Sequence, residues 1–481
     1  MNNLPALLTL IGYSAFLFAV GMWASRRAAS SDGFLLGDRD LGPWVAGLAY
    51  AASSSSAWVL LGFSGFVYTA GPSALWMVPG ILIGYGVVWL WAGPVLQNAS
   101  RDKGHLTLTD FLCETAGPRI TPVIKIAASA MIAFAFCYYV ASQFQGAGTA
   151  FDGLFDTGMA TGIVLGALII VAYTFLGGFV AVSVIDTCQG ILIAVVAVVL
   201  PAAGFVAAGG VEGISEAIRA APETYRDSFG GRAGWIAGGF VLGLFATGFG
   251  ALGQPHLIAW IMAARDRRAR VTGAGIAIGW GMLVYTGMAV LGLSARALFG
   301  ADAPAEGVFL KLAEDLLPAV LAGIIAAAVL SAIMSTVDSQ LLVAGAAISH
   351  DLGLGRLLGG RDVLASRIAV VLVCAAAVVL SLVFPASIFE RTLFAWTALG
   401  AAFGPVVVAR ALRLAITGWG VLASLLAGFG AALAFEFWLP SGPGAVWART
   451  LPWLFAFLAL GAGDLARKSF ASPRRALGER A

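Results

Sequence analysis

The sequence AASSSSAW, residues 51–58, lies at the centre of an apolar segment that runs from about residue 44 to residue 70. Four consecutive serines compete with the helix for backbone hydrogen bonds, so this pattern predicts that the helix unwinds there. The alternative is a helix contact between small residues, because serine and alanine let two helices approach closely. Both interpretations require that the surrounding apolar residues form a helix.

The composition indicates an all-α integral membrane protein. Of the 481 residues, 60% are hydrophobic and only 11% are charged, whereas a soluble protein carries about 25% charged residues. A water-soluble multidomain enzyme is therefore excluded, and the apolar side chains must face lipid. The four cysteines and three histidines show no metal-ligand or paired spacing. No nucleophile–base pair or phosphate-binding loop supports a membrane-bound enzyme either.

The apolar segments can be counted, since each crossing of the hydrocarbon core needs about 20 residues. Breaks at charged and Pro/Gly-rich positions give thirteen predicted membrane helices, at 4–24, 44–70, 74–97, 122–150, 158–181, 183–209, 233–263, 271–299, 316–349, 364–384, 391–412, 417–437 and 445–465. The first has no basic residues ahead of it, and Arg26 and Arg27 follow it, so we interpret it as a retained helix and not a signal peptide.

The basic residues predict the orientation. With the N-terminus outside and the C-terminus in the cytoplasm, 21 of the 28 Lys and Arg residues fall on the cytoplasmic side, as cytoplasmic loops require. We therefore expect a multi-pass protein of the plasma (inner) membrane that acts as a monomer. The basic run 265–270 is interpreted as an orientation signal between two apolar segments, and not as a nucleic-acid site.

A second interruption lies five segments after the first. Residues 243–256 contain four glycines with Gln254, Pro255 and His256. Two broken helices at matching places in oppositely oriented halves indicate a secondary transporter with an inverted repeat. The predicted divisions are a first helix and loop, two repeats, two peripheral helices and a basic tail, at 1–43, 44–232, 233–413, 414–465 and 466–481.

A third polar cluster follows one helical face in segment 316–349. Ser331, Ser335 and Ser339 recur every four residues, with Thr336 and Asp338 beside them. Hydroxyl and carbonyl oxygens are hard ligands of the type that an alkali cation prefers. Hydrogen bonding between helices is the alternative for the hydroxyls, but a carboxylate inside the membrane needs a partner.

Asp186 is the other acid that the apolar context predicts to be buried. It stands near the cytoplasmic end of segment 183–209, where it either takes part in ion binding or caps the helix at the membrane surface.

Five stretches in chain order resemble the sodium/solute symporter family, and among its members the proline carriers most. They are LLGDRDLGPWVAGL (35–48), YTFLGGFVAVSVIDTCQ (173–189), GQPHLIAWIMAA (253–264), MSTVDSQLLV (334–343) and GAAFGPVVVAR (400–410). The resemblance implies a leucine-transporter-like core of two inverted five-helix repeats within thirteen helices. It also implies sodium as the coupling ion, bound by carbonyls and hydroxyls of Ala52, Ser55, Ala332, Ser335 and Thr336. Some family members hold a second cation, for which this chain offers Asp186, Ser335, Asp338 and Ser339.

The chain departs from the proline carriers at several of these places. They have an aspartate at Ser54, a tryptophan at Thr247, a tyrosine at Ala251 and a serine at Asp338, whereas Tyr139 matches. One hypothesis is that a carboxylate has moved from the broken helix to segment 316–349. The predicted solute site is at mid-membrane and consists of Ser54, Ser56, Ala57, Trp58, Tyr139, Gln143, Thr247, Ala251 and Gln254.

The predicted function is sodium-coupled import of a small organic solute by alternating access, with proline or another amino acid as the solute. Broken helix ends offer amide donors to a carboxylate. No Lys or Arg lies at that depth, so a multiply charged anion does not fit. Sodium- or proton-coupled import of a monocarboxylate, sugar or polyol is the alternative. A channel or a transport-like sensor domain is the alternative of a different class.

Overall fold

The computed structural model describes residues 4–25, 36–174, 179–357, 359, 361–439 and 446–475. These residues form helices joined by turns, and their one pairing of extended backbone is the isolated bridge between Leu41 and Ala264. Several sequence predictions fall partly outside the described residues: the loop 26–35, residues 175–178 of the second quoted motif, and residues 476–481 of the basic tail.

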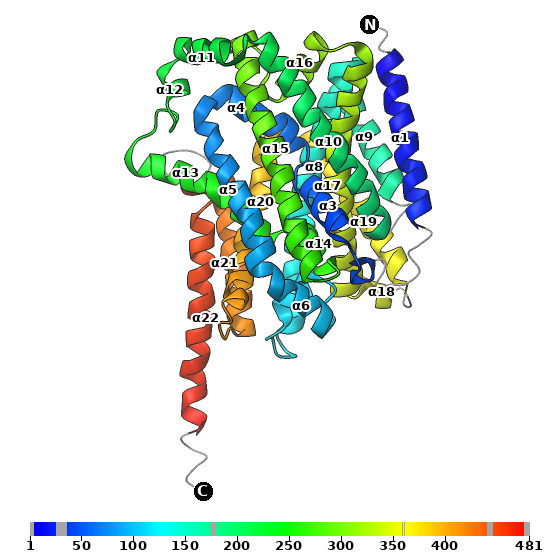
Figure 1. Ribbon diagram of the computed structural model, residues 1–481. Helices are drawn as coiled ribbons and strands as arrows, with labels where there is room; N and C mark the ends of the chain where they lie inside the picture. Colours follow the sequence, from blue (N-terminus) through cyan, green and yellow to red (C-terminus); the bar gives the residue numbers. More distant parts are fainter. Residues whose placement is uncertain are drawn as a thin grey trace.

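The helices stand mostly side by side, and the first turn of the first helix and the last turn of the last helix lie at opposite ends of the bundle (Figure 1). The long helices are α1 (Leu4–Ser25), α8 (Thr121–Phe155), α9 (Met159–Thr174), α10 (Phe179–Ala207), α15 (Arg267–Phe299), α17 (Ala319–Ala346), α19 (Asp362–Val383), α20 (Ile388–Ala411), α21 (Gly418–Phe437) and α22 (Leu451–Arg475). The other helices continue or connect them: α3 (Pro43–Ser54), α4 (Ser64–Ala70), α5 (Met77–Gly86), α6 (Gly93–Lys103), α7 (Leu108–Cys113), α11 (Gly210–Ala220), α12 (Glu223–Arg226), α13 (Gly234–Phe249), α14 (Pro255–Ala263), α16 (Val308–Leu316) and α18 (Leu354–Leu357).

Among the described residues, ten helical runs are long and apolar enough to cross a membrane. One of them, Trp58–Lys103, has 46 residues. A straight helix of that length would measure about 69 Å, more than twice the hydrocarbon thickness. The chain turns within it at Gly71, whose φ of 63° is a conformation that suits glycine. The run thus covers more than one predicted segment, and the total of thirteen helices stays a prediction.

Both predicted helix breaks are confirmed. Helix α3 ends at Ser54, Ser55 leaves helical geometry (φ −117°, ψ 63°), and a π-helical turn (η2, Trp58–Phe63) leads into α4. Helix α13 passes into a 3-10 turn (η5, Gly250–Gly253), Gln254 is extended, and α14 begins at Pro255. Proline suits that first position, because it has no N–H group to leave unpaired.

Glycines let the second break pack backbone against backbone. A Cβ atom on Gly248 would lie 2.0 Å from the carbonyl oxygen of Gly80 in α5, and one on Gly84 would lie 2.2 Å from that of Gly248. Gly253 meets the Leu399 carbonyl of α20 in the same way, at 2.2 Å. No other residue fits at these contacts, so the interrupted helix is held between α5 and α20.

Helices α17 and α20 form the centre of the bundle. In their most apolar 18-residue windows, 83% and 94% of the residues are buried, against 22% for α1. A lipid-facing helix needs no polar surface, but a helix buried on every side can carry polar groups only where they find partners. The hydroxyls of α17 therefore have to be satisfied by neighbouring helices.

Candidate functional site

The hydroxyl groups of α17 meet the last carbonyl groups of α3. Ser335 Oγ donates to the Ala52 carbonyl at 3.2 Å, and Thr336 Oγ1 donates to the Ser53 carbonyl at 2.9 Å. The Ala332 carbonyl lies 3.2 Å from Ser335 Oγ and 3.1 Å from Thr336 Oγ1. All five residues are fully buried. Because α3 stops at Ser54, its last carbonyls lack the amide partners that a continuing helix would supply; the Ala52 carbonyl accepts from the Ser55 amide at 3.2 Å and still receives the Ser335 hydroxyl of α17.

These contacts bring together four of the five groups predicted to bind sodium. The fifth residue, Ser55, lies in the break itself, and its buried hydroxyl has no hydrogen-bond partner among the described residues. Every contributing atom is oxygen, which is the donor set of a hard cation and not of zinc or copper. A bound cation would take the carbonyl oxygens now used by the two hydroxyl protons.

Ser53 joins this cluster to a carboxylate. Its hydroxyl lies 3.1 Å from Asp186 Oδ2 in α10 and 3.2 Å from the Ser335 carbonyl. Asp186 is fully buried, and its other oxygen, Oδ1, has no hydrogen-bond partner among the described residues. Ser53 is not among the site residues predicted from the sequence. Its membership of the four-serine run was the available signal, but which serine faces which helix depends on where the helix stops.

Asp338 and Ser339 lie on α17 next to the cation cluster. Asp338 is fully buried, and Ser339 donates to the carbonyls of Ser335 at 3.1 Å and Thr336 at 2.9 Å. Ser331, one turn in the other direction, bonds to Tyr13 of α1 at 2.6 Å instead. The predicted polar face therefore contacts two different helices along its length, α1 at Ser331 and α3 at Ser335 and Thr336.

The residues after the first break contact α8. The Ala57 amide donates to Gln143 Oε1 at 3.1 Å, and the hydroxyl groups of Ser56 and Tyr139 lie 3.4 Å apart. The Trp58 indole N–H turns back to the Ser54 carbonyl at 3.1 Å. Ser56 and Ala57 in the break are therefore in direct contact with both predicted solute residues of α8.

The predicted solute residues of the second break make a different set of contacts. Gln254 Nε2 donates to the Trp396 carbonyl of α20 at 3.3 Å, and Ala251 is fully buried. Thr247 bonds within its own helix, to the Gly243 carbonyl at 3.1 Å. Among the first-break residues, the Ser54 hydroxyl points away from α8, toward Tyr85 of α5.

Aromatic rings fill the space beside the first break. The Trp58 ring centroid lies 5.9 Å from that of Tyr285, 6.2 Å from Phe389 and 6.1 Å from Trp396. Each of the nine predicted solute residues is at most 3% exposed. In this conformation the centre is therefore closed to water. Trp396 is not among the residues predicted from the sequence, because one tryptophan among 14 in an apolar chain gives no signal of which neighbours it contacts.

A sequence model of one family matches most of the chain. The model of the sodium:solute symporter family covers residues 34–428. This chain belongs to that family. The symporter is similar to the high-affinity proline transporter of Bacillus subtilis (strain 168), with 31% identity over 86% of this chain and 88% of that protein. It is also 31% identical to the sodium/proline symporter of Escherichia coli (strain K12), over 88% of this chain and 86% of that protein.

Solved structures share the fold of the symporter. A Na+-coupled sialic acid symporter in a substrate-bound outward-open state matches 96% of this chain and 98% of its own, with a TM-score of 0.79 and 16% identity. Mhp1, a nucleobase-cation-symport-1 family transporter, matches 91% of this chain and 96% of its own, with a TM-score of 0.59 and 11% identity. The all-helical, leucine-transporter-like fold predicted from the sequence is thereby confirmed, and at these identities the likeness concerns the fold alone.

A charged cluster of the symporter lies beyond the two breaks, where α7, α8 and the π-helical turn that follows α17 (η7, Ala347–Asp351) meet. Lys125 Nζ lies 2.8 Å from Asp110 Oδ1 and 3.5 Å from Asp351 Oδ1, and His350 Nε2 lies 3.4 Å from Asp110 Oδ2. Burial raises the pKa of Asp110, but hydrogen bonds from His350 and Lys125 outweigh it, so the pKa lies below its ordinary value. Charge pairing therefore joins three segments that are distant in sequence.

Proposed function

We propose that this symporter couples the inward movement of sodium to the import of proline or another amino acid by alternating access. The observation that carries the proposal is the meeting of the Ser335 and Thr336 hydroxyls with the Ala52 and Ser53 carbonyls at the first break. Only an interrupted helix frees carbonyls at this depth, and hard oxygen atoms that converge there suit an alkali cation. The names of the proline-transporting relatives support the choice of solute.

The proposed sodium ligands are the carbonyls of Ala52, Ser55 and Ala332 and the hydroxyls of Ser335 and Thr336. A cation bound there would link α3 to α17 and neutralise the partial negative charge at the end of α3. Its movement across the membrane supplies about 2.3 kcal/mol per charge for each 100 mV of potential. That energy, added to the sodium gradient, would drive the solute inward.

The solute is proposed to bind between the two breaks and α8. The Ala57 amide, the Tyr139 hydroxyl and the amide groups of Gln143 and Gln254 provide both donors and acceptors. An amino acid carries one carboxylate and one ammonium group and needs such a mixed set. None of the nine proposed solute residues is Lys or Arg, which argues against a multiply charged anion. The closed aromatic layer around Trp58 would have to open toward one side for entry and the other for release.

The proposed topology has thirteen membrane helices, two inverted repeats at 44–232 and 233–413, an external N-terminus and a cytoplasmic C-terminus. Arg101 supports the grouping of the cytoplasmic loops, because it donates to the carbonyls of Arg39, at 2.6 Å, and Ala264, at 3.3 Å. Three loops that we assign to the cytoplasm thus meet. The excess of basic residues in these loops sets the orientation.

A second cation is proposed near Asp186, Asp338, Ser335 and Ser339. Asp186 and Asp338 are two fully buried carboxyl groups in this part of the bundle, and a sodium ion or protons bound between them would offset their charge. We expect Asp338→Asn to change the dependence of uptake on sodium or on pH, whereas Ser331→Ala, about two turns earlier on the same helix and bonded to Tyr13 of α1, is the control that should leave both unchanged. If Asp338→Asn left both dependences unchanged, the second cation site would be wrong.

The test of the proposed function is uptake into proteoliposomes of purified protein. Labelled proline should accumulate when sodium is outside and the interior is negative, and it should not accumulate when potassium replaces sodium. A screen of other amino acids and monocarboxylates as competitors would define the solute class. Wild-type protein that bound no amino acid in the presence of sodium would refute the proposal.

A further inference from the structure

His256 is a buried side chain that the proposed sodium and solute sites leave unexplained. It is the second residue of α14, directly after the second break, and it is only 1% exposed. Neither Nδ1 nor Nε2 has a hydrogen-bond partner among the described residues. Leaving a buried polar group unsatisfied is costly, so such a group in a native protein calls for a partner that the chain does not supply.

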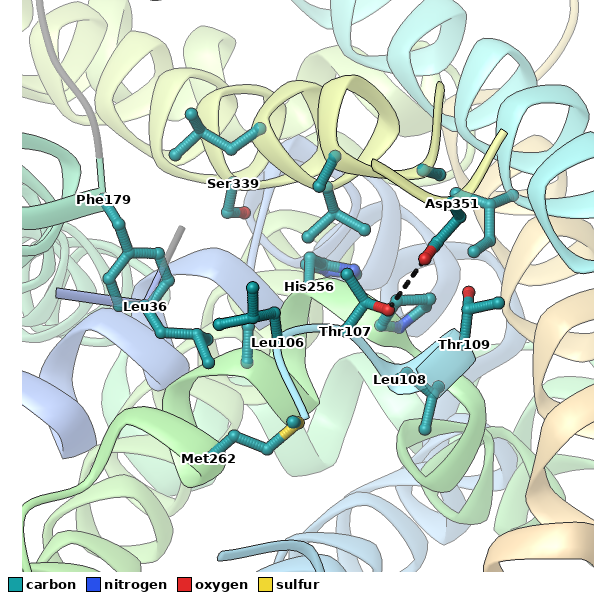
Figure 2. Close-up of a pocket in the computed structure, with 17 residues that line it drawn as sticks. Leu36, Leu106, Thr107, Leu108, Thr109, Phe179, His256, Met262, Ser339 and Asp351 are labelled. Carbon is teal, nitrogen blue, oxygen red and sulfur yellow. Dashed lines mark hydrogen bonds between the residues drawn. The ribbon is translucent and has the colours of Figure 1, made fainter. Parts of the chain in front are cut away.

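The imidazole ring faces a cavity. Figure 2 shows His256 in its middle, with Ser339 of α17 on one side and Thr107 and Asp351 on the other. Thr107 Oγ1 donates to Asp351 Oδ1 at 3.2 Å, which fixes that end of the cavity. The rest of the lining is mostly apolar, with Leu36, Leu106, Leu108, Ile132, Phe179 and Met262. A few polar groups among apolar walls are typical of a small-molecule site.

His256 also adjoins the proposed solute site. Its ring centroid lies 6.3 Å from that of Tyr139, nearly at right angles, and the Tyr139 hydroxyl reaches Ser56 in the first break. Gln254, another proposed solute residue, precedes His256 by two positions, with Pro255 between them. The other end of the cavity is at Asp351, beside Lys125 and Asp110. His256 thus lies between the solute residues and the charged cluster that we assign to the cytoplasmic side.

We propose that His256 is the polar centre of an inner subsite, which receives the amino-acid solute on its way from the central site to the cytoplasm. A neutral imidazole offers one N–H donor for a carboxylate and one nitrogen acceptor for an ammonium group. The cavity now has about 30 Å³, enough for water but not for an amino acid. The subsite is therefore closed in this conformation and widens when the inner side opens. The inference rests on the proposed function, because it requires a solute with these groups.

The test compares the two faces of the transporter in proteoliposomes. His256→Leu removes the polar atoms, and it should raise the proline concentration that half-saturates transport from the cytoplasmic face about ten-fold, the equivalent of one lost hydrogen bond. The half-saturating concentration at the external face should change less than about two-fold. His256→Gln keeps a donor and an acceptor and should restore most of the affinity. Leu106→Met, in the same cavity wall, is the control for a volume-conserving change.

Equal shifts at both faces, or no shift at either, would overturn the inner subsite. Wild-type protein without sodium-dependent proline uptake would instead refute the proposed function, so the two failures are distinguishable.

A chemical measurement avoids dependence on a variant that fails to fold. The chain has three histidines, so in a variant with His105→Gln and His350→Gln the histidine adduct of diethyl pyrocarbonate, followed by its ultraviolet absorbance, reports on His256 alone. Proline at its half-saturating concentration, supplied to the cytoplasmic face without sodium, should slow modification about two-fold. Modification at an unchanged rate would count against the proposal.

Discussion

Removal of the Thr336 hydroxyl should weaken the response of transport to sodium. That hydroxyl lies 2.9 Å from the Ser53 carbonyl and 3.1 Å from the Ala332 carbonyl, at a fully buried position. A hydrogen bond or ligand contact to a charged group contributes about 1.5–3 kcal/mol, so Thr336→Ala should raise the sodium concentration for half-maximal uptake about 10- to 150-fold. Thr336→Ser keeps the oxygen and should stay close to wild type.

Ser335→Ala should act in the same direction, because the Ser335 hydroxyl reaches the Ala52 carbonyl. The double variant should lose less than the two single changes added together, since both groups bind one ion. The measurement is initial uptake of labelled proline at a series of sodium concentrations, at constant ionic strength and membrane potential.

The chain provides a matched control on the same helix. Ser331 lies one turn before Ser335, is equally buried, and bonds to Tyr13 of α1 and to the Ala327 carbonyl. Ser331→Ala removes the same group from the same helix, but away from the break, and should leave the sodium dependence unchanged. An equal loss in Ser331→Ala and Ser335→Ala would show that the hydroxyls act only in helix packing, and the cation site would be wrong.

Two further predictions concern stability. Gly248→Ala should lower the melting temperature and abolish uptake, because the new Cβ would lie 2.0 Å from the Gly80 carbonyl oxygen and overpacking costs about 1–3 kcal/mol or more. Gly275→Ala is the control, because a Cβ there would have nothing within 4 Å. Equal melting temperatures of the two variants would contradict the close contact at Gly248. Because the pKa of Asp110 is lowered, its contribution to stability is present above its ordinary pKa of 3.8 and is lost as the pH falls through the lowered pKa. At neutral pH, Asp110→Asn should therefore have a lower melting temperature than the wild type, and its melting temperature should fall less on acidification. If the melting temperatures of the two proteins fell equally with pH, this role of Asp110 would be refuted.

The broad architecture could be predicted because it depends on chain-local properties. Apolar length predicts where helices lie, and the serine run and the glycines around residue 250 mark where helices stop. The chain then breaks at Ser55 and at Gln254, within the predicted intervals. Apolar length does not by itself give the number of crossings, because a run such as Trp58–Lys103 stays helical through a turn.

The contacts within the site could not be predicted in the same way. Ser53, Ser54 and Ser55 are identical side chains on successive residues, yet they face α10, α5 and the break itself. Which one meets Asp186 depends on the rotation of α3 about its axis, and this is set by packing over its whole length. The position of Trp396 beside Trp58 depends likewise on α20 and has no local signature.

The arrangement of the first break gives a physical reason why sodium and solute would bind cooperatively. The proposed sodium ligand Ala52 lies in the last turn of α3, and Ser55 lies in the break directly after it; the proposed solute donor Ala57 immediately precedes the next helical segment. A cation that fixes the first group limits the positions open to the second, and linkage requires the effect to be mutual. Thr336→Ala should accordingly weaken proline binding at low sodium and leave it unchanged at saturating sodium. A variant that weakened proline binding equally at every sodium concentration would show that Thr336 acts on the solute site directly and not through the cation.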